Sequence, residues 1–135
     1  MNAVVRGGIV AAVALTFGLG GAVALAPATA KDIMGKLNKG PSSLFPNLKR
    51  ELQKDEPDWA DVQAQTKEYA SLAASLSQAR PPKGTKESWV KLTQDYAAAA
   101  KTMNDAAQKK DKSAALAAHN KLQKACMACH NAHRQ

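Results

Sequence analysis

Helical periodicity of the apolar residues is the feature that most constrains the fold of this chain. In residues 59–76 and 85–107 the apolar side chains recur mostly at intervals of three, four or seven, the pattern of helices that bury one face. No stretch alternates long enough to predict a strand. Only 4% of the residues are aromatic, and alanine dominates the apolar runs. The chain is therefore predicted to be all-α, with helices that pack through small and aliphatic side chains.

Glycine, proline and capping residues indicate where the first two helical segments begin and end. Residues 31–54 form a first arm that we expect to be bent or broken near Gly40, which precedes a proline. A second helix is expected to begin around residues 56–57, with Asp55 as its cap and Pro57 in its first turn.

The second half of the chain predicts two further helices. Residues 80–84 break the chain, and Thr85 is a suitable cap for a third helix. Asp111 is the expected cap of a fourth helix, which runs to about His133. Four helices joined by short links predict an antiparallel four-helix bundle. Aromatic residues at core spacing on the second and third helices are Trp59, Tyr69, Trp89 and Tyr96.

Residues 1–30 have the pattern of a secretory signal peptide. Arg6 is the only charged residue before Lys31, residues 9–26 are apolar, and positions 28–30 read Ala-Thr-Ala. Cleavage there would leave one domain, residues 31–135, in a periplasmic or otherwise exported location. The alternative is an uncleaved anchor, because a spanning helix needs about 20 apolar residues. No other segment could span a membrane, so no stable membrane insertion is expected after cleavage.

Two cysteines and a histidine form a C-x-x-C-H sequence close to the C-terminus, at Cys126, Cys129 and His130. This spacing is typical of c-type haem attachment, in which two thiols add to the vinyl groups of the porphyrin and the histidine binds the iron. On a helix, residues three and four positions apart share a face. The sequence therefore predicts one covalent haem c, carried by the last helix.

Two other uses of the cysteine pair are weaker. A disulfide or a thioredoxin-like redox pair needs no histidine at this position, and the latter needs a βαβ context that is missing. A zinc site would need a second pair of ligands, because one helix cannot easily complete a tetrahedron. A disulfide between cysteines only three positions apart would constrain little of the fold. A chain this short also buries a modest core. A cofactor in the centre of the domain would supply the missing stabilisation.

With its leader, its four predicted helices and a haem motif near the C-terminus, the chain resembles the class II c-type cytochromes. This family includes cytochrome c-prime and its six-coordinate, low-spin relatives. The resemblance covers residues 31–135 as architecture, but its specific part is confined to residues 126–134. It implies a four-helix bundle whose haem serves electron transfer or the binding of a small gas.

The resemblance also assigns roles to the residues of the motif. It implies that Cys126 and Cys129 are the thioether anchors and that His130 is the proximal iron ligand. Arg134 matches the basic residue one turn beyond that ligand, although a solvated helix end explains it equally well. His133 departs from the aromatic residue that is common there, and we expect it to be a surface histidine rather than a second ligand.

The second axial position of the iron decides between two functions. In six-coordinate members of the family a methionine on the first helix fills it, and Met34 is the only methionine on the first arm. Alternatives are an open site, a packing role for Met34, and another ligand, chiefly His119 or Met103. His119 lies about three turns, roughly 16 Å, from His130 along the same helix, too far to reach the same iron.

These observations predict a diffusible, exported one-electron carrier, with a gas-binding protein for nitric oxide or carbon monoxide as the alternative. A peroxidase would need a distal histidine or arginine, and the first arm has no histidine, so we do not expect an enzyme. The formal charge is +8, and the last helix is strongly basic, which favours an acidic redox partner. Export makes nucleic acid an unsuitable partner.

Overall fold

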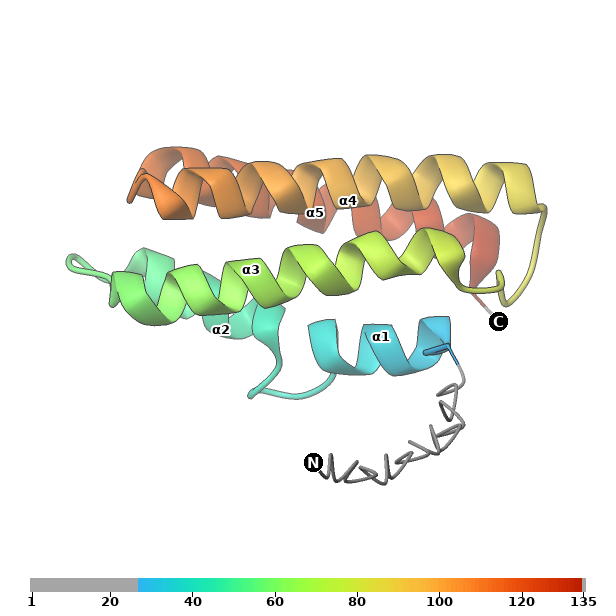
Figure 1. Ribbon diagram of the computed structural model, residues 1–135, viewed down its shortest axis with the longest axis horizontal. Helices are drawn as coiled ribbons and strands as arrows, with labels where there is room; N and C mark the ends of the chain where they lie inside the picture. The colour runs from blue at the N-terminus through green and yellow to red at the C-terminus, as the bar shows by residue number, and fades with distance from the viewer. Residues whose placement is uncertain (1–26, 135) are drawn as a thin grey trace, which may run out of the picture.

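The computed structural model describes residues 27–134, and this part of the chain contains five α-helices, one short 3-10 helix and no strand (Figure 1). The predicted all-α class is therefore confirmed. The elements are α1 (Ala30–Asn38), α2 (Leu44–Gln53), α3 (Trp59–Ser75), η1 (Leu76–Gln78), α4 (Lys86–Gln108) and α5 (Lys112–His133). Residues 1–26, which hold most of the predicted signal peptide, lie outside the described residues.

The predicted first arm is broken into two helices. Helix α1 ends at Asn38, and the chain turns at Gly40. The φ of Gly40 is +87°, a backbone conformation that residues with a Cβ rarely adopt. At the other end of α1, Thr29 and Asp32 form a capping box. The predicted cleavage after Ala30 would remove Thr29 and with it this cap.

The capping predictions hold for α4 and α5 but not for α3. The Thr85 hydroxyl accepts a hydrogen bond from the Ser88 N–H (3.3 Å), and the Asp111 carboxylate accepts one from the Ala114 N–H (2.9 Å). The expected start of α3 near residue 56 is wrong. Asp58 is the cap, because its carboxylate accepts hydrogen bonds from the backbone N–H groups of Ala60 (3.1 Å) and Asp61 (3.2 Å).

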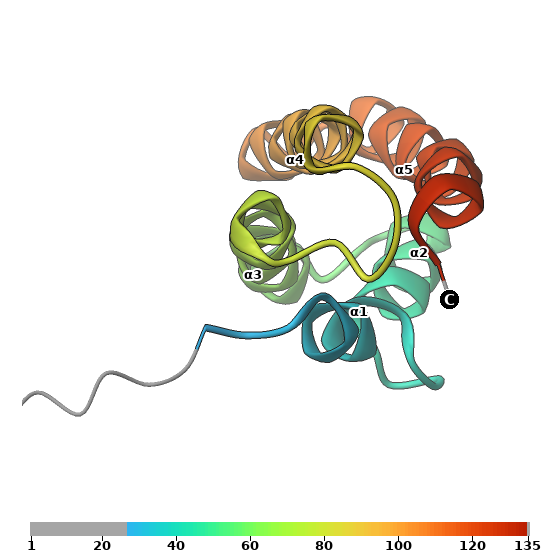
Figure 2. The ribbon, with the colours of Figure 1, turned by 90° about the vertical axis from the view of Figure 1, so that its right-hand side faces the viewer.

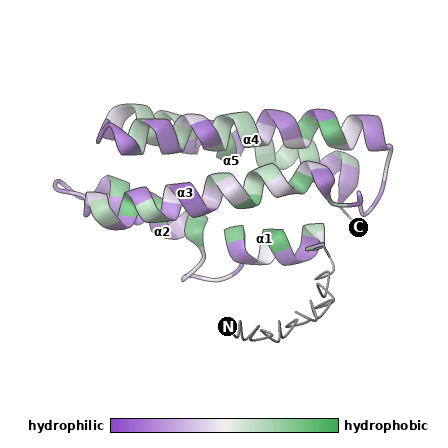
Figure 3. Cartoon of the chain, in the orientation of Figure 1, coloured by the Kyte–Doolittle hydropathy of each residue, from purple (hydrophilic) through white to green (hydrophobic). Residues whose placement is uncertain are grey.

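The three long helices α3, α4 and α5 follow one another with alternating direction (Figure 1), and α4 packs against both of the others. Helix α1 packs on α2 and α3, and α2 also contacts α5. Figure 2 shows the helices surrounding a common interior. Hydrophilic and hydrophobic residues alternate along the ribbons (Figure 3), as expected for helices that each bury one face.

The predicted core aromatics are buried, except for Trp59. The hydroxyls of Tyr69 and Tyr96 are hydrogen-bonded to each other, and the Trp89 indole N–H donates to the Leu76 carbonyl (2.9 Å). Trp59 is only partly buried against the core. Because the two tyrosine hydroxyls and the Trp89 indole N–H have hydrogen-bond partners inside the protein, these large amphipathic rings can be buried among alanines.

His119 is a structural residue of the same core. Its Nε2–H donates to the Phe45 carbonyl (2.9 Å), and its ring stacks on that of Phe45 with centroids 3.9 Å apart. Burial lowers the pKa of His119, so its imidazole is held neutral. Nothing in residues 27–134 forms a helix with the length and apolar character needed to cross a membrane.

Candidate cofactor site

The C-x-x-C-H residues occupy the last turns of α5, where Cys126, Cys129 and His130 are half-buried. Cys126 and Cys129 are both free thiols, and the Cys126 Sγ–H donates to the Leu122 carbonyl one turn earlier (3.3 Å). Burial raises the pKa of both thiols, so they are held protonated at neutral pH. No hydrogen bond occupies the ring of His130 within the described part of the chain, and its nitrogens are free to bind a metal.

A cavity of about 540 Å³ opens beside these residues, between the C-terminal end of α5 and α1. Its volume is within the range that small-molecule and cofactor sites occupy. Cys129 and His130 line it from α5, and Met34 lines it from α1. The other lining residues are Ala30, Lys31, Gly35, Asn38, Lys39, Pro82, Trp89, His133 and Arg134.

A second, much smaller cavity brings Met34 together with the complete motif. It is lined by Met34, Cys126, Cys129 and His130, and by Asn38 and Tyr96 among others. Burial, above all, raises the pKa of Tyr96 to about 12, so its hydroxyl remains protonated at physiological pH. The predicted ligand from the first arm and the predicted haem anchors therefore share one site, although almost one hundred positions separate them in the sequence.

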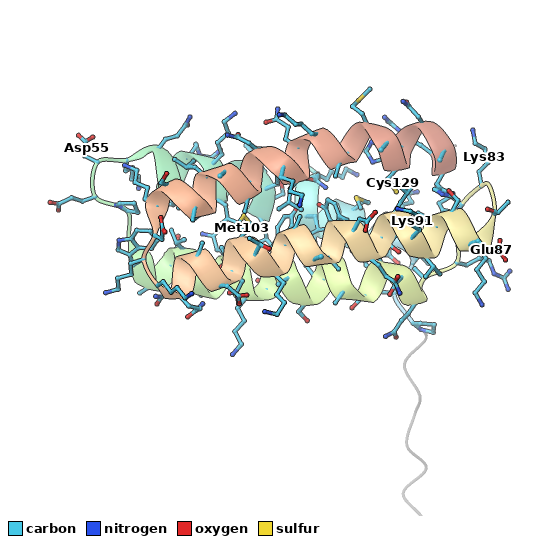
Figure 4. The ribbon with its side chains drawn as sticks, turned by 90° about the horizontal axis from the view of Figure 1, so that it is seen from above. Asp55, Lys83, Glu87, Lys91, Met103 and Cys129 are labelled. Atoms are coloured by element: carbon cyan, nitrogen blue, oxygen red, sulfur yellow. The ribbon has the colours of Figure 1, made fainter. Side chains whose placement is uncertain are left out.

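The two other candidate ligands lie elsewhere. Met103 is fully buried in the core, and neither Met103 nor His119 lines the two cavities. Figure 4 shows that Met103 and Cys129 lie well apart along the molecule, whereas Lys83 is at the same end as Cys129. Of the alternatives considered from the sequence, only Met34 lies at the motif.

The expectation that His133 is a surface histidine is wrong. Only 2% of its surface is exposed, and its ring lies edge-on to Trp89 with centroids 5.2 Å apart. Its Nδ1–H donates to the Lys83 carbonyl (2.6 Å), so Nε2 is the acceptor for the Ser88 hydroxyl (3.1 Å). His133 thus fastens the loop between η1 and α4 to the helix that carries the motif, one turn beyond His130.

Gly84 makes this close contact possible. Its φ is +80°, and a Cβ at this position would lie 2.9 Å from Nδ1 of His133 and 3.0 Å from the Ala132 carbonyl oxygen. Such distances require either the loop or the histidine to move.

We predict that Gly84→Ala destabilises the protein by about 2–4 kcal/mol, because the strain of a positive φ is added to this clash. Gly40→Ala is the matched control. Gly40 also has a positive φ, but a Cβ there would meet nothing within 4 Å, so only the conformational cost of about 1 kcal/mol is expected. Chemical denaturation measures both. Equal losses for the two variants would contradict the close packing of Gly84 on His133.

Arg134 lies both at the end of α5 and beside the large cavity. It follows α5 directly, and its backbone N–H donates to the His130 carbonyl (3.0 Å), so it caps the helix. Its side chain is exposed but lines the large cavity beside His130. Together with Lys31 and Lys39 it makes the rim of the cavity basic, which suits a ligand with carboxylate groups.

The donor groups around the cavities fit a covalently bound haem. Met34, Cys129 and His130 line both cavities, and Cys126 lines the smaller one. Trp89 adds an aromatic ring to the large cavity, and Tyr96 adds one to the small cavity. Haem c uses thiols for attachment and either histidine or methionine as axial ligands. Within residues 27–134 no three His, Cys, Asp or Glu side chains gather closely enough to hold a metal ion by themselves.

Comparison with known proteins does not assign the chain to a family. Neither a protein-family model, nor a curated protein, nor a solved structure matches it. The resemblance to class II c-type cytochromes therefore depends on the motif and on the helices that present it.

Sequence reasoning missed three contributors to this site. Ser88 and Gly84 shape the wall of the cavity through His133, and Asn38 lines both cavities. The Pro-Pro-Lys-Gly sequence before Thr85 predicts a turn. It does not predict that this turn packs against the C-terminal end of α5. Asn38 had a signal in its position four residues after Met34, on the same face of a helix.

Proposed function

We propose that this protein is an exported monohaem c-type cytochrome of the class II kind, which carries one electron between redox partners. The observation that carries the proposal is the meeting of Met34, Cys126, Cys129 and His130 at one pair of cavities. In this proposal the domain is an antiparallel four-helix bundle, in which α1 and α2 together take the place of the first helix.

The residues of the site have distinct tasks. Cys126 and Cys129 would hold the ring covalently through their sulfurs, and His130 and Met34 would bind the iron. The bound haem supplies one-electron chemistry between ferrous and ferric iron. The aromatic and aliphatic side chains of the walls would shield part of a bound ring from water, which limits the rearrangement of solvent that accompanies electron transfer.

The surface near the motif fits an acidic redox partner. Met127, between the two cysteines, is 63% exposed, the only large hydrophobic residue so exposed among those that the structure describes. Lys121 and Lys124 are exposed on the preceding turns of α5, and Lys83 is at the same end of the molecule as Cys129 (Figure 4). Opposite charge raises the rate of encounter between redox proteins. We propose no binding of nucleic acid and no catalytic activity.

The absorption spectrum of the purified, reduced protein tests this function against gas binding. Six-coordinate low-spin iron gives sharp, split visible bands, and an iron that Met34 binds would resist carbon monoxide. We expect this result. Broad, merged bands and immediate binding of carbon monoxide would instead identify an open site, and the gas-binding function would replace the carrier.

A further inference from the structure

Asn38 makes a specific contact with the proposed methionine ligand. Its Nδ2–H donates to Sδ of Met34 at 3.5 Å, a suitable distance for a hydrogen bond to sulfur. The two residues lie four positions apart on α1, so their side chains share one face of the helix. Both line the large and the small cavity.

This contact leaves the sulfur able to bind a metal. A thioether sulfur has two lone pairs, and the Asn38 amide engages one of them. The other remains free, and Met34 lines the small cavity together with His130 and the two cysteines. Because donor and acceptor belong to the same helix, the hydrogen bond does not depend on how closely α1 approaches α5.

The polar side chains that α4 contributes to the small cavity are hydrogen-bonded to groups other than Met34. The Thr93 hydroxyl donates to the Trp89 carbonyl (2.7 Å), and the Tyr96 hydroxyl is paired with that of Tyr69. The Asn38 amide lies close enough to Tyr96 to favour its charged form, although burial, the larger effect, still raises the pKa to about 12. Asn38 therefore interacts with both Tyr96 and Met34, and it alone donates to the Met34 sulfur in the described part of the chain.

We propose that Asn38 is the positioning residue for Met34 and that it sets the reduction potential of the site; this rests on the proposed function, in which Met34 binds the iron. The N–H···S hydrogen bond fixes the rotamer of the thioether. It also withdraws electron density from sulfur, which weakens the bond to ferric iron more than the bond to ferrous iron. The hydrogen bond thus favours the reduced state.

The test compares Asn38→Leu, which has a similar size and no donor, with the parent holoprotein. We expect the ratio of ferrous to ferric affinity to fall about tenfold, the scale of one hydrogen bond, which is ~59 mV for a one-electron couple. Spectroelectrochemical titration measures this potential. The weak red absorption band of ferric iron bound to methionine sulfur should also lose intensity, because the thioether is no longer held in one rotamer.

Two further variants separate positioning from a general effect on α1. Lys36→Leu changes an exposed residue of the same helix that lines neither cavity, and its potential should equal that of the parent. Asn38→Gln retains an amide donor on a longer side chain and should recover part of the shift. It also provides the measurement if the leucine variant does not fold.

The outcomes distinguish the two proposals. If the parent lacks the methionine–iron band, Met34 is not a ligand, and both proposals are wrong. If the parent has the band but Asn38→Leu retains the parental potential and band intensity, Met34 binds the iron without help from Asn38, and only the positioning role is overturned.

Discussion

Replacement of Met34 by leucine is expected to convert the iron from a six-coordinate to an open, five-coordinate site. Leucine fills nearly the same volume, so the packing of α1 is largely kept and the stability should change by less than about 1.5 kcal/mol. The lost thioether bond removes the methionine–iron absorption band and lowers the reduction potential. Carbon monoxide, which we expect the parent to exclude, should then bind rapidly.

Met103→Leu is the matched control for this experiment. Met103 is the methionine that lies fully buried in the core and away from both cavities. Its replacement should leave the spectrum, the potential and the reaction with carbon monoxide unchanged. If Met34→Leu behaves like Met103→Leu in all three measurements, Met34 is a packing residue that does not bind the iron, and this result would contradict the proposed carrier function.

The second large effect is expected when Cys126 and Cys129 are both changed to alanine. Without the thioether bonds haem is no longer retained covalently, and a cavity of about 540 Å³ remains between α1 and α5. The contacts that a bound haem makes with these walls are lost, so we expect a loss of well over 3 kcal/mol and a broad, weakly cooperative thermal transition. Circular dichroism with thermal melting measures the effect.

Met127→Ala is the control for the cysteine variant. Its side chain lies between the two cysteines and is exposed, so its truncation should alter neither haem attachment nor the melting transition. A double cysteine variant that melts as sharply and at as high a temperature as Met127→Ala would contradict the role of haem in completing the core.

Local chemistry made much of the fold predictable. Thr85 and Asp111 cap their helices as expected, because a short oxygen-bearing side chain before an amphipathic stretch satisfies free backbone N–H groups. The same rule placed the start of α3 too early, since Asp55 and Asp58 both precede that helix and only the structure shows which one caps it. The break of the first arm followed from the glycine before a proline at positions 40–41.

The surroundings of the motif were harder to predict, because they depend on contacts between distant segments. The motif residues and Met34 were found from spacing and resemblance, but the cavity that joins them arises from the way α1 and α5 pack on other helices. His133 has the sequence context of a fraying helix end. It is buried because a loop some fifty positions earlier supplies an acceptor at Lys83, and no local pattern carries that information.

Covalent attachment of haem at Cys126 and Cys129 is the central claim, and the mass of the exported protein tests it most directly. Expressed in cells with an active haem-maturation pathway, the parent should have the mass of the chain from Lys31 plus one haem that acid acetone does not extract. The variant with both cysteines changed to alanine should have the haem-free mass. A parent protein that is also haem-free under these conditions would contradict the account.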